Sequence, residues 1–273
     1  MLVNQWIQFG VVPAVLAFAA VGLIRLVAGR TIGPKIASSG ASIAVLISFA
    51  IGRGSVTLLD DPLFLIMSSL VASGLVADLL FQSVRPLMRT LIIAAPLLAL
   101  LWMANPQIGG PLNFETALFG ACFVAIAVIL FSFSDFEPTD VTPVVLLAMV
   151  ALGIGLVLLL AGEQFGAGVS LSASAAVAAF FLWNFPKKRF AVGGGLMIGV
   201  AALLLLFASA AVIEGTANRL SLAILILVFF ADKVFRLPVL SSRAGKAVAP
   251  FVLAGVSGIV VLAAIAAAML TTF

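Results

Sequence analysis

Three aspartates stand near the ends of long apolar segments, where a carboxylate could hold a proton or a cation. They are Asp78 in ASGLVADLLFQSVRP, Asp135 in VILFSFSDFEP and Asp232 in LVFFADKVFRLP. An acid in such a segment needs a partner or water, because an unpaired charge in lipid is costly. Two interpretations stay open: a carboxylate that couples ion movement to transport, and an interfacial ion pair with a base such as Arg85 or Lys233. The position near the segment ends favours the ion pair.

Other polar side chains suggest contacts with solutes or lipids. Arg25 precedes LVAGR, and it could contact a lipid headgroup or, more specifically, a lipid phosphate or a substrate anion. Two groups of serines fall within apolar segments: Ser68, Ser69 and Ser73, and Ser170, Ser172 and Ser174. Such hydroxyls can coordinate a solute in a transport path, but serine more commonly allows close helix packing in membranes.

The residue types that are missing narrow the chemistry. The chain has no histidine and a single cysteine, Cys122. It therefore lacks an imidazole for haem binding, a catalytic triad or a proton relay, and it cannot form an internal disulfide. The sequence also shows no glycine-rich phosphate loop, nucleophilic serine motif or metal-ligand cluster. We predict a protein that is not an enzyme and carries no cofactor.

The composition is that of a chain immersed in lipid. Hydrophobic residues make up 64% of the 273 residues and charged residues only 9%, against about 25% charged in soluble domains. A span needs about 20 mostly apolar residues. Ten segments fit: 5–28, 36–52, 63–82, 88–104, 114–133, 141–161, 168–185, 190–213, 218–235 and 247–270. Because the connections are short, we predict an all-α bundle of about ten transmembrane helices in a single transmembrane domain, 1–273.

Prolines mark the connections at a nearly constant interval. Pro34, Pro86, Pro138, Pro186 and Pro238 follow one another at steps of 52, 52, 48 and 52 residues. A fixed period of this size is typical of a repeated supersecondary unit. The sequence therefore predicts five helical hairpins with a period near 52 residues.

Two features suggest an internal duplication. The stretches SSGAS at 38–42 and VGGGL at 192–196 lie 154 residues apart, as do Asp78 and Asp232. Residues 1–104 would then correspond to 160–273, with a central hairpin at 114–161 between them. Two inverted halves of five helices each are the alternative, since inverted repeats are common in transporters.

Basic residues predict the orientation in the membrane. Twelve of the 14 lie on the side that holds the five prolines, and the other two are Arg53 and Arg219. Cytoplasmic loops are rich in Lys and Arg, so we predict that both termini lie on the non-cytoplasmic side, most simply of a bacterial cytoplasmic membrane. The loop 134–142, SDFEPTDVT, has only acidic charges; it is a tolerated exception or a docking or ion-contact point.

In its ten predicted spans and its length, the chain is similar to the drug/metabolite transporter superfamily, a resemblance of topology. Short loops, possible repeats and prolines within spans favour a small permease or flippase for an apolar or amphiphilic solute. The alternative is a non-catalytic accessory or structural subunit of a larger membrane complex, which the scarcity of polar residues at span centres favours. The expected partners are membrane lipids and, for the alternative, other membrane proteins. Nucleic-acid binding is not expected, because no basic run alternates with aromatic residues.

Overall fold

The part of the chain that the structure describes consists of helices and short connections and contains no strand. The computed structural model describes residues 7–53, 61–81, 84–103, 114–134, 136, 140–235 and 248–271. The elements are η1 (Ile7–Val11), α2 (Val12–Val27), α3 (Gly29–Ile36), α4 (Ser39–Arg53), α5 (Pro62–Leu80), α6 (Arg85–Met103), α7 (Phe114–Phe133), α8 (Thr142–Leu160), α9 (Gln164–Asn184), α10 (Gly194–Leu196), η3 (Met197–Ala201), α11 (Ala202–Glu214), α12 (Arg219–Ile226), η4 (Leu227–Phe230), α13 (Ala231–Phe235) and α15 (Ala249–Thr271).

Within these residues, eight helices are long and apolar enough to cross a membrane. A ninth span is obtained if α3 and α4, which meet at an angle of 58°, are taken as one broken span. The protein is therefore a polytopic membrane protein, but the expected count of ten spans is not confirmed. The segment expected at 218–235 is helical in three consecutive pieces, α12, η4 and α13, of 8, 4 and 5 residues.

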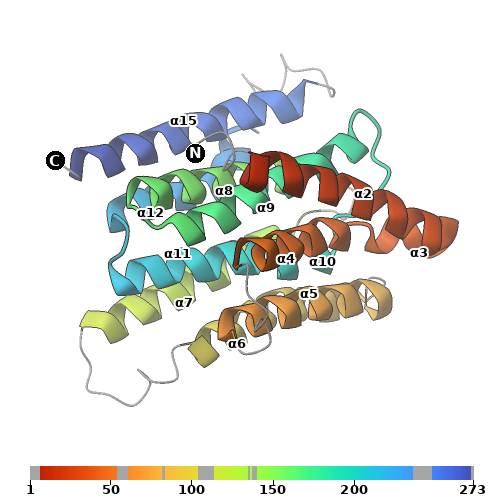
Figure 1. Ribbon diagram of the computed structural model, residues 1–273, viewed down its shortest axis with the longest axis horizontal. Coiled ribbons are helices and arrows are strands. Elements are labelled where there is room, and N and C mark those ends of the chain that lie inside the picture. The colour runs from red at the N-terminus through yellow and green to blue at the C-terminus, as the bar shows by residue number, and fades with distance from the viewer. Residues whose placement is uncertain are drawn as a thin grey trace.

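The core of the bundle lies around three helices. α8 and α9 pack against each other, and both are largely buried, as is the continuous helix Gly194–Glu214. We call this last helix, built from α10, η3 and α11, the central helix. α2 and α4 pack on α9, α15 packs on α8 and α12, and α5 packs on the start of the central helix. In Figure 1, α15 runs along one edge of the bundle and α5 and α6 run along the opposite edge.

Local sequence signals explain where several helices begin and end. Asp61 accepts a hydrogen bond from the Leu63 amide at 2.9 Å, and Pro62 follows it at the first position of α5, an arrangement that favours helix initiation. Asn218 caps α12 in the same way. The central helix ends at Gly215, whose φ of 69° is the left-handed conformation in which glycine is favoured.

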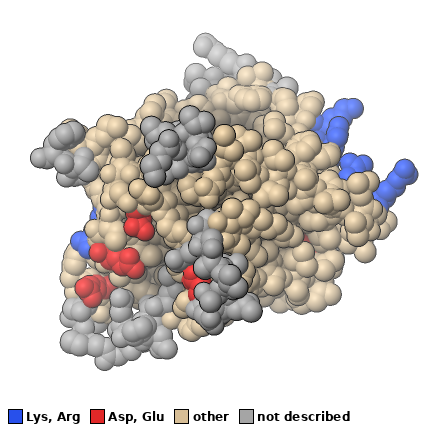
Figure 2. Space-filling view, in the orientation of Figure 1, with Lys and Arg blue, Asp and Glu red and all other residues tan. Residues whose placement is uncertain are grey.

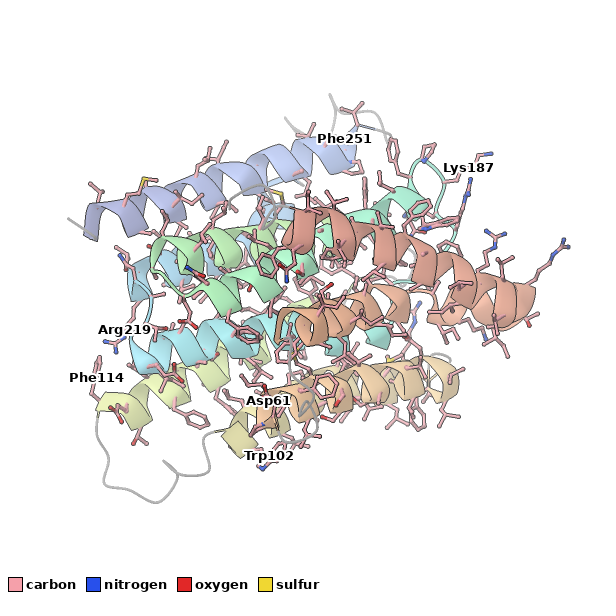
Figure 3. The ribbon with its side chains drawn as sticks, in the orientation of Figure 1. Asp61, Trp102, Phe114, Lys187, Arg219 and Phe251 are labelled. Carbon is pink, nitrogen blue, oxygen red and sulfur yellow. The ribbon has the colours of Figure 1, made fainter. Side chains whose placement is uncertain are left out.

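Charged side chains gather at the two ends of the bundle (Figure 2). The basic end holds α3 and the connection 185–193, and the opposite end carries Glu163 and Glu214. Figure 3 shows Lys187 at the basic end, and Arg219 and Phe114 at the opposite end. Arg219 is fixed there by a hydrogen bond from its Nε to the Val212 carbonyl at 3.0 Å, and its guanidinium lies 5.2 Å from the centre of the Phe114 ring.

Candidate functional site

The most polar buried group of the described bundle surrounds Asp78, two residues before the end of α5. The side chain is buried, with 1% of its surface exposed. Its Oδ1 accepts a hydrogen bond from the Gly194 amide at 2.5 Å, and its Oδ2 accepts one from the Gly195 amide at 2.8 Å. The Ser38 hydroxyl donates to Oδ2 at 3.2 Å. The carboxylate thus accepts hydrogen bonds from three donors, which belong to two other segments of the chain.

The position of Asp78 follows from the physics of helix ends. The first amides of a helix have no partner within that helix, and the peptide dipoles make this end positive. Gly194 and Gly195 are the first two residues of the central helix. A carboxylate supplied by α5 therefore satisfies two amides that would otherwise be buried without a partner, and it balances the positive helix end.

Glycines allow three helices to meet at this point. A Cβ at position 74 would lie 2.7 Å from the Gly194 carbonyl oxygen, and one at position 195 would lie 2.7 Å from the Ser39 backbone nitrogen. A Cβ at Gly193 would collide with the Asp78 carboxylate itself. We call this contact the Asp78 junction; it comprises Ser38, Ser39, Ser42, Gly74, Asp78, Gly193, Gly194 and Gly195.

The Asp78 junction also connects the two stretches that the sequence matched as repeats. The Ser42 hydroxyl of the SSGAS stretch donates a hydrogen bond to the Gly195 carbonyl of the VGGGL stretch. Both stretches begin helices, α4 and α10. They therefore contact each other directly in the folded protein, while the duplication itself stays a prediction.

The expected ion pair between Asp78 and Arg85 is wrong. Among the described residues, the partners of the Asp78 carboxylate are two backbone amides and a hydroxyl, as given above, whereas Arg85 lines a separate cavity at the basic end. The physical reason is that an unsatisfied helix start offers several fixed donors to a buried carboxylate, while an arginine near the surface is solvated. Asp232 is also buried, with 7% of its surface exposed, in α13. Asp135 lies outside the described residues.

The candidate serines differ in their hydrogen-bond partners. The hydroxyls of Ser69 and Ser73 donate to carbonyls of their own helix, those of Ile66 at 2.7 Å and Leu70 at 2.9 Å. Ser172 is buried in α9, and its hydroxyl has no hydrogen-bond partner within the described part of the chain. These serines do not form one polar cluster, which is the arrangement expected for residues that allow close packing.

Arg25 belongs to an aromatic group at the basic end. Its guanidinium lies 5.6 Å from the centre of the Phe190 ring, within the range of a cation–π interaction. Trp183 stacks on Phe18 with ring centres 4.6 Å apart, and its indole nitrogen donates to the Phe18 carbonyl at 3.1 Å. These contacts join the end of α9 and the connection after it to α2.

The described residues line cavities at both ends of the bundle and on one of its sides. A cavity of about 540 Å³ at the basic end lies between α6, α7, α8 and the start of the central helix. A cavity of about 310 Å³ at the opposite end includes Glu163 and Glu214. A third, of about 550 Å³, lies between η1, α4, α8 and α9, and we call it the lateral groove. All three fall in the size range of ligand sites.

The lateral groove was missed by sequence reasoning, although one of its serines was named. It is lined by Gln8, Phe9, Gln164 and Ser174, among others. Phe9 packs over Gly168, and the Ser174 hydroxyl donates to the Ala148 carbonyl at 2.9 Å. The signal present in the sequence is a face of small residues on the segment 168–185, which by itself also predicts ordinary helix packing.

A metal site is not supported by the described residues, because they contain no group of three or more histidine, cysteine, aspartate or glutamate side chains suited to hold an ion. Of the cavities described, the one at the basic end adjoins the Asp78 junction through Gly193. No protein-family model and no curated protein matches this chain.

Proposed function

We propose that the protein is a small permease or flippase for an amphiphilic solute. The observation that carries the proposal is the lateral groove, which combines polar groups at one end with a long apolar wall. Its volume of about 550 Å³ is within the range of sites for small ligands. Transporters for amphiphiles need such a surface, because the apolar part of the solute can stay in contact with lipid while the polar part is protected.

The lining of the groove fits an amphiphile that lies along α9. Leu171, Ser174, Ala175 and Ala178 share one face of this helix and line the groove, since their spacing follows the helical period. From Gln164 to Ala178 the helix rises by about 21 Å at 1.5 Å per residue. The groove thus follows α9 from its first residue to beyond its middle. The amides of Gln8 and Gln164 mark its polar end.

Irregular helices support a protein that changes conformation. The central helix contains a π-helical turn at Met197–Ala201, and a 3-10 turn at Leu227–Phe230 interrupts the segment between α12 and α13. Such interruptions weaken helical hydrogen bonding and are frequent at functional positions. In transporters, broken helices commonly line the binding site. Here the π-helical turn follows the Asp78 junction directly.

We expect the basic end to face the cytoplasm, with both termini on the other side of a bacterial cytoplasmic membrane. The charge asymmetry of the loops supports this orientation. In a variant in which Cys122 is replaced by alanine, a cysteine at the exposed Thr31 should resist a membrane-impermeant maleimide added to intact cells. A cysteine at the exposed Ala161 should react. The opposite pattern would reverse the orientation.

The transport proposal predicts that filling the groove slows transport. Ala175→Phe places an aromatic ring in the groove, and we expect transport of a fluorescent short-chain phospholipid across reconstituted vesicles to fall about tenfold, as for a barrier raised by about 1.4 kcal/mol. The matched control is Ala263→Phe, an exposed position on α15, which should leave the rate nearly unchanged.

The transport measurements also distinguish a permease or flippase from an accessory subunit. Equal rates in both variants would remove the groove from the transport path. Vesicles of the wild-type protein that transport no lipid or amphiphilic dye faster than empty vesicles would contradict the proposal. The native mass of the detergent-solubilised protein then decides the alternative, because an accessory subunit would be isolated together with its partner membrane proteins.

A further inference from the structure

The cavity at the basic end differs from the lateral groove in its charge. Its walls come from the start of α6, the end of α7, the start of α8 and the start of the central helix. The cavity measures about 540 Å³. Basic pockets between transmembrane helices on the cytoplasmic side are typical binding places for anionic lipid headgroups.

Two arginines form the charged part of the lining, which also includes the hydroxyls of Thr90 and Ser134. Arg85 and Arg89 are four residues apart on α6 and therefore lie on one face of it. The Arg89 Nε donates to the Ser134 hydroxyl at 2.8 Å, and its guanidinium lies 4.5 Å from the centre of the Phe131 ring. These contacts fix the position of the side chain beside the cavity. Guanidinium groups bind phosphate oxygens with paired, charge-assisted hydrogen bonds.

The remaining lining is mostly apolar. Met88, Ile92, Phe133 and Met197 supply much of it. Ile92 and Phe133 are buried, with 7% and 3% of their surfaces exposed. A free inorganic anion would leave this part of the cavity without a suitable partner, whereas an alkyl chain would fill it and remove apolar surface from water.

The Asp78 junction limits where an anion can sit. Gly193 lines the cavity, and the Asp78 carboxylate lies directly behind it, because a Cβ at Gly193 would collide with that group. The amides that start the central helix are already bound to Asp78. Because these two amides already bind Asp78, the affinity for a phosphate would come mainly from the arginines at the rim.

We propose that the basic-end cavity binds the phosphate group of an anionic amphiphile, with Arg85 and Arg89 on the phosphate and the apolar lining on the alkyl chain. This inference rests on the proposed function in one respect: the proposed function names the class of solute or regulatory lipid. The binding itself is measured without transport.

The test uses three probes on the purified full-length protein in an uncharged detergent. Dioctanoyl phosphatidic acid carries both the phosphate and the alkyl chains, dioctanoylglycerol carries only the chains, and inorganic phosphate carries only the anion. Ligand-induced stabilisation and titration give the affinity of each. We expect phosphatidic acid to bind at least about tenfold more tightly than either partial probe, since one charge-assisted contact accounts for that factor.

Variants locate the site. Arg85→Gln and Arg89→Gln should each raise the Kd for phosphatidic acid by about tenfold. Arg85→Gln is the variant that keeps the test valid if Arg89→Gln fails to fold, because Arg85 is exposed. The matched control is Lys188→Gln, which removes the same charge from the same end outside the cavity lining and should change the Kd less than about twofold.

Each contrary outcome overturns a defined part of the inference. Equal losses in Arg85→Gln and Lys188→Gln would mean that only the overall charge of this end attracts the lipid. Inorganic phosphate that binds as tightly as phosphatidic acid would exclude the amphiphile. Intact phosphatidic acid binding in a protein that transports nothing would contradict the proposed function alone, and transport without such binding would contradict this inference alone.

Discussion

Replacing Asp78 with alanine is expected to lower the free energy of unfolding by about 4 kcal/mol, the largest effect of any polar substitution in the described bundle. The change leaves the Gly194 and Gly195 amides and the Ser38 hydroxyl without the acceptor that they share. A buried donor that loses its partner costs about 1–3 kcal/mol, and lipid offers no water to replace it. Unfolding in a denaturing detergent, followed by circular dichroism, measures the loss.

A second acid serves as the control for this prediction. Asp61 also caps a helix, since it accepts a hydrogen bond from the Leu63 amide, but it is only partly buried at the opposite end of α5. Asp61→Ala should cost about 1 kcal/mol, the usual effect of a lost helix cap. Equal costs for Asp61→Ala and Asp78→Ala would show that the Asp78 junction does not hold the helices together.

Asp78→Asn distinguishes a structural carboxylate from a coupling one. The amide keeps one acceptor oxygen, but its NH₂ group faces donors, so we expect a stability loss between those of the wild type and Asp78→Ala. Transport per folded molecule should be retained. A variant that folds as well as the wild type yet no longer responds to a proton or sodium gradient would instead support the ion-coupling interpretation of Asp78.

The membrane class and most span positions could be predicted from the sequence because they depend on local composition. A run of about 20 apolar residues is a requirement of the bilayer and not of a particular fold. The expected spans 63–82 and 141–161 therefore agree closely with α5 and α8. The segment 218–235 shows the limit of this reasoning: its apolar residues were recognised, but its 3-10 turn at Leu227–Phe230 depends on packing.

The partner of Asp78 could not be predicted from proximity in the sequence. Arg85 is seven residues away along the chain, whereas the Gly194 amide is 116 residues away. A signal was nevertheless present, because three consecutive glycines that precede an apolar run mark a helix start open to close approach. Because these glycines were interpreted only as packing residues, the carboxylate that binds their amides was not identified from the sequence.

The repeat remains a prediction, because several of the residues that define it lie outside the described part of the chain. Pro138 and Pro238, two of the five prolines that define the period, lie outside the described residues, as does Asp135. Asp78 lies near the end of an unbroken helix of 19 residues, while Asp232 lies in a five-residue piece. The two similar local sequences thus lie in different structures, one in a long continuous helix and the other in a short helical piece.

The second large effect is expected from Gly195→Ala. The new methyl group would lie 2.7 Å from both the Cα and the backbone nitrogen of Ser39, distances that real side chains do not adopt. Because the obstacle is the backbone of the segment that begins α4, it cannot be relieved by a rotamer change. Either α4 or the central helix has to move, and the Asp78 hydrogen bonds would lengthen with it. We expect a loss of about 3 kcal/mol or more, the upper range for overpacking.

Gly255→Ala is the matched control, and its expected effect has the opposite sign. Gly255 lies on α15, and a Cβ there would meet no atom within 4 Å. Alanine in a helix interior is favoured over glycine by about 1 kcal/mol at most, so this variant should be unchanged or slightly more stable. Unfolding midpoints of the two variants in the same detergent provide the comparison. If Gly195→Ala unfolded no earlier than Gly255→Ala, the close approach of α4 to the central helix, and with it the Asp78 junction, would be wrong.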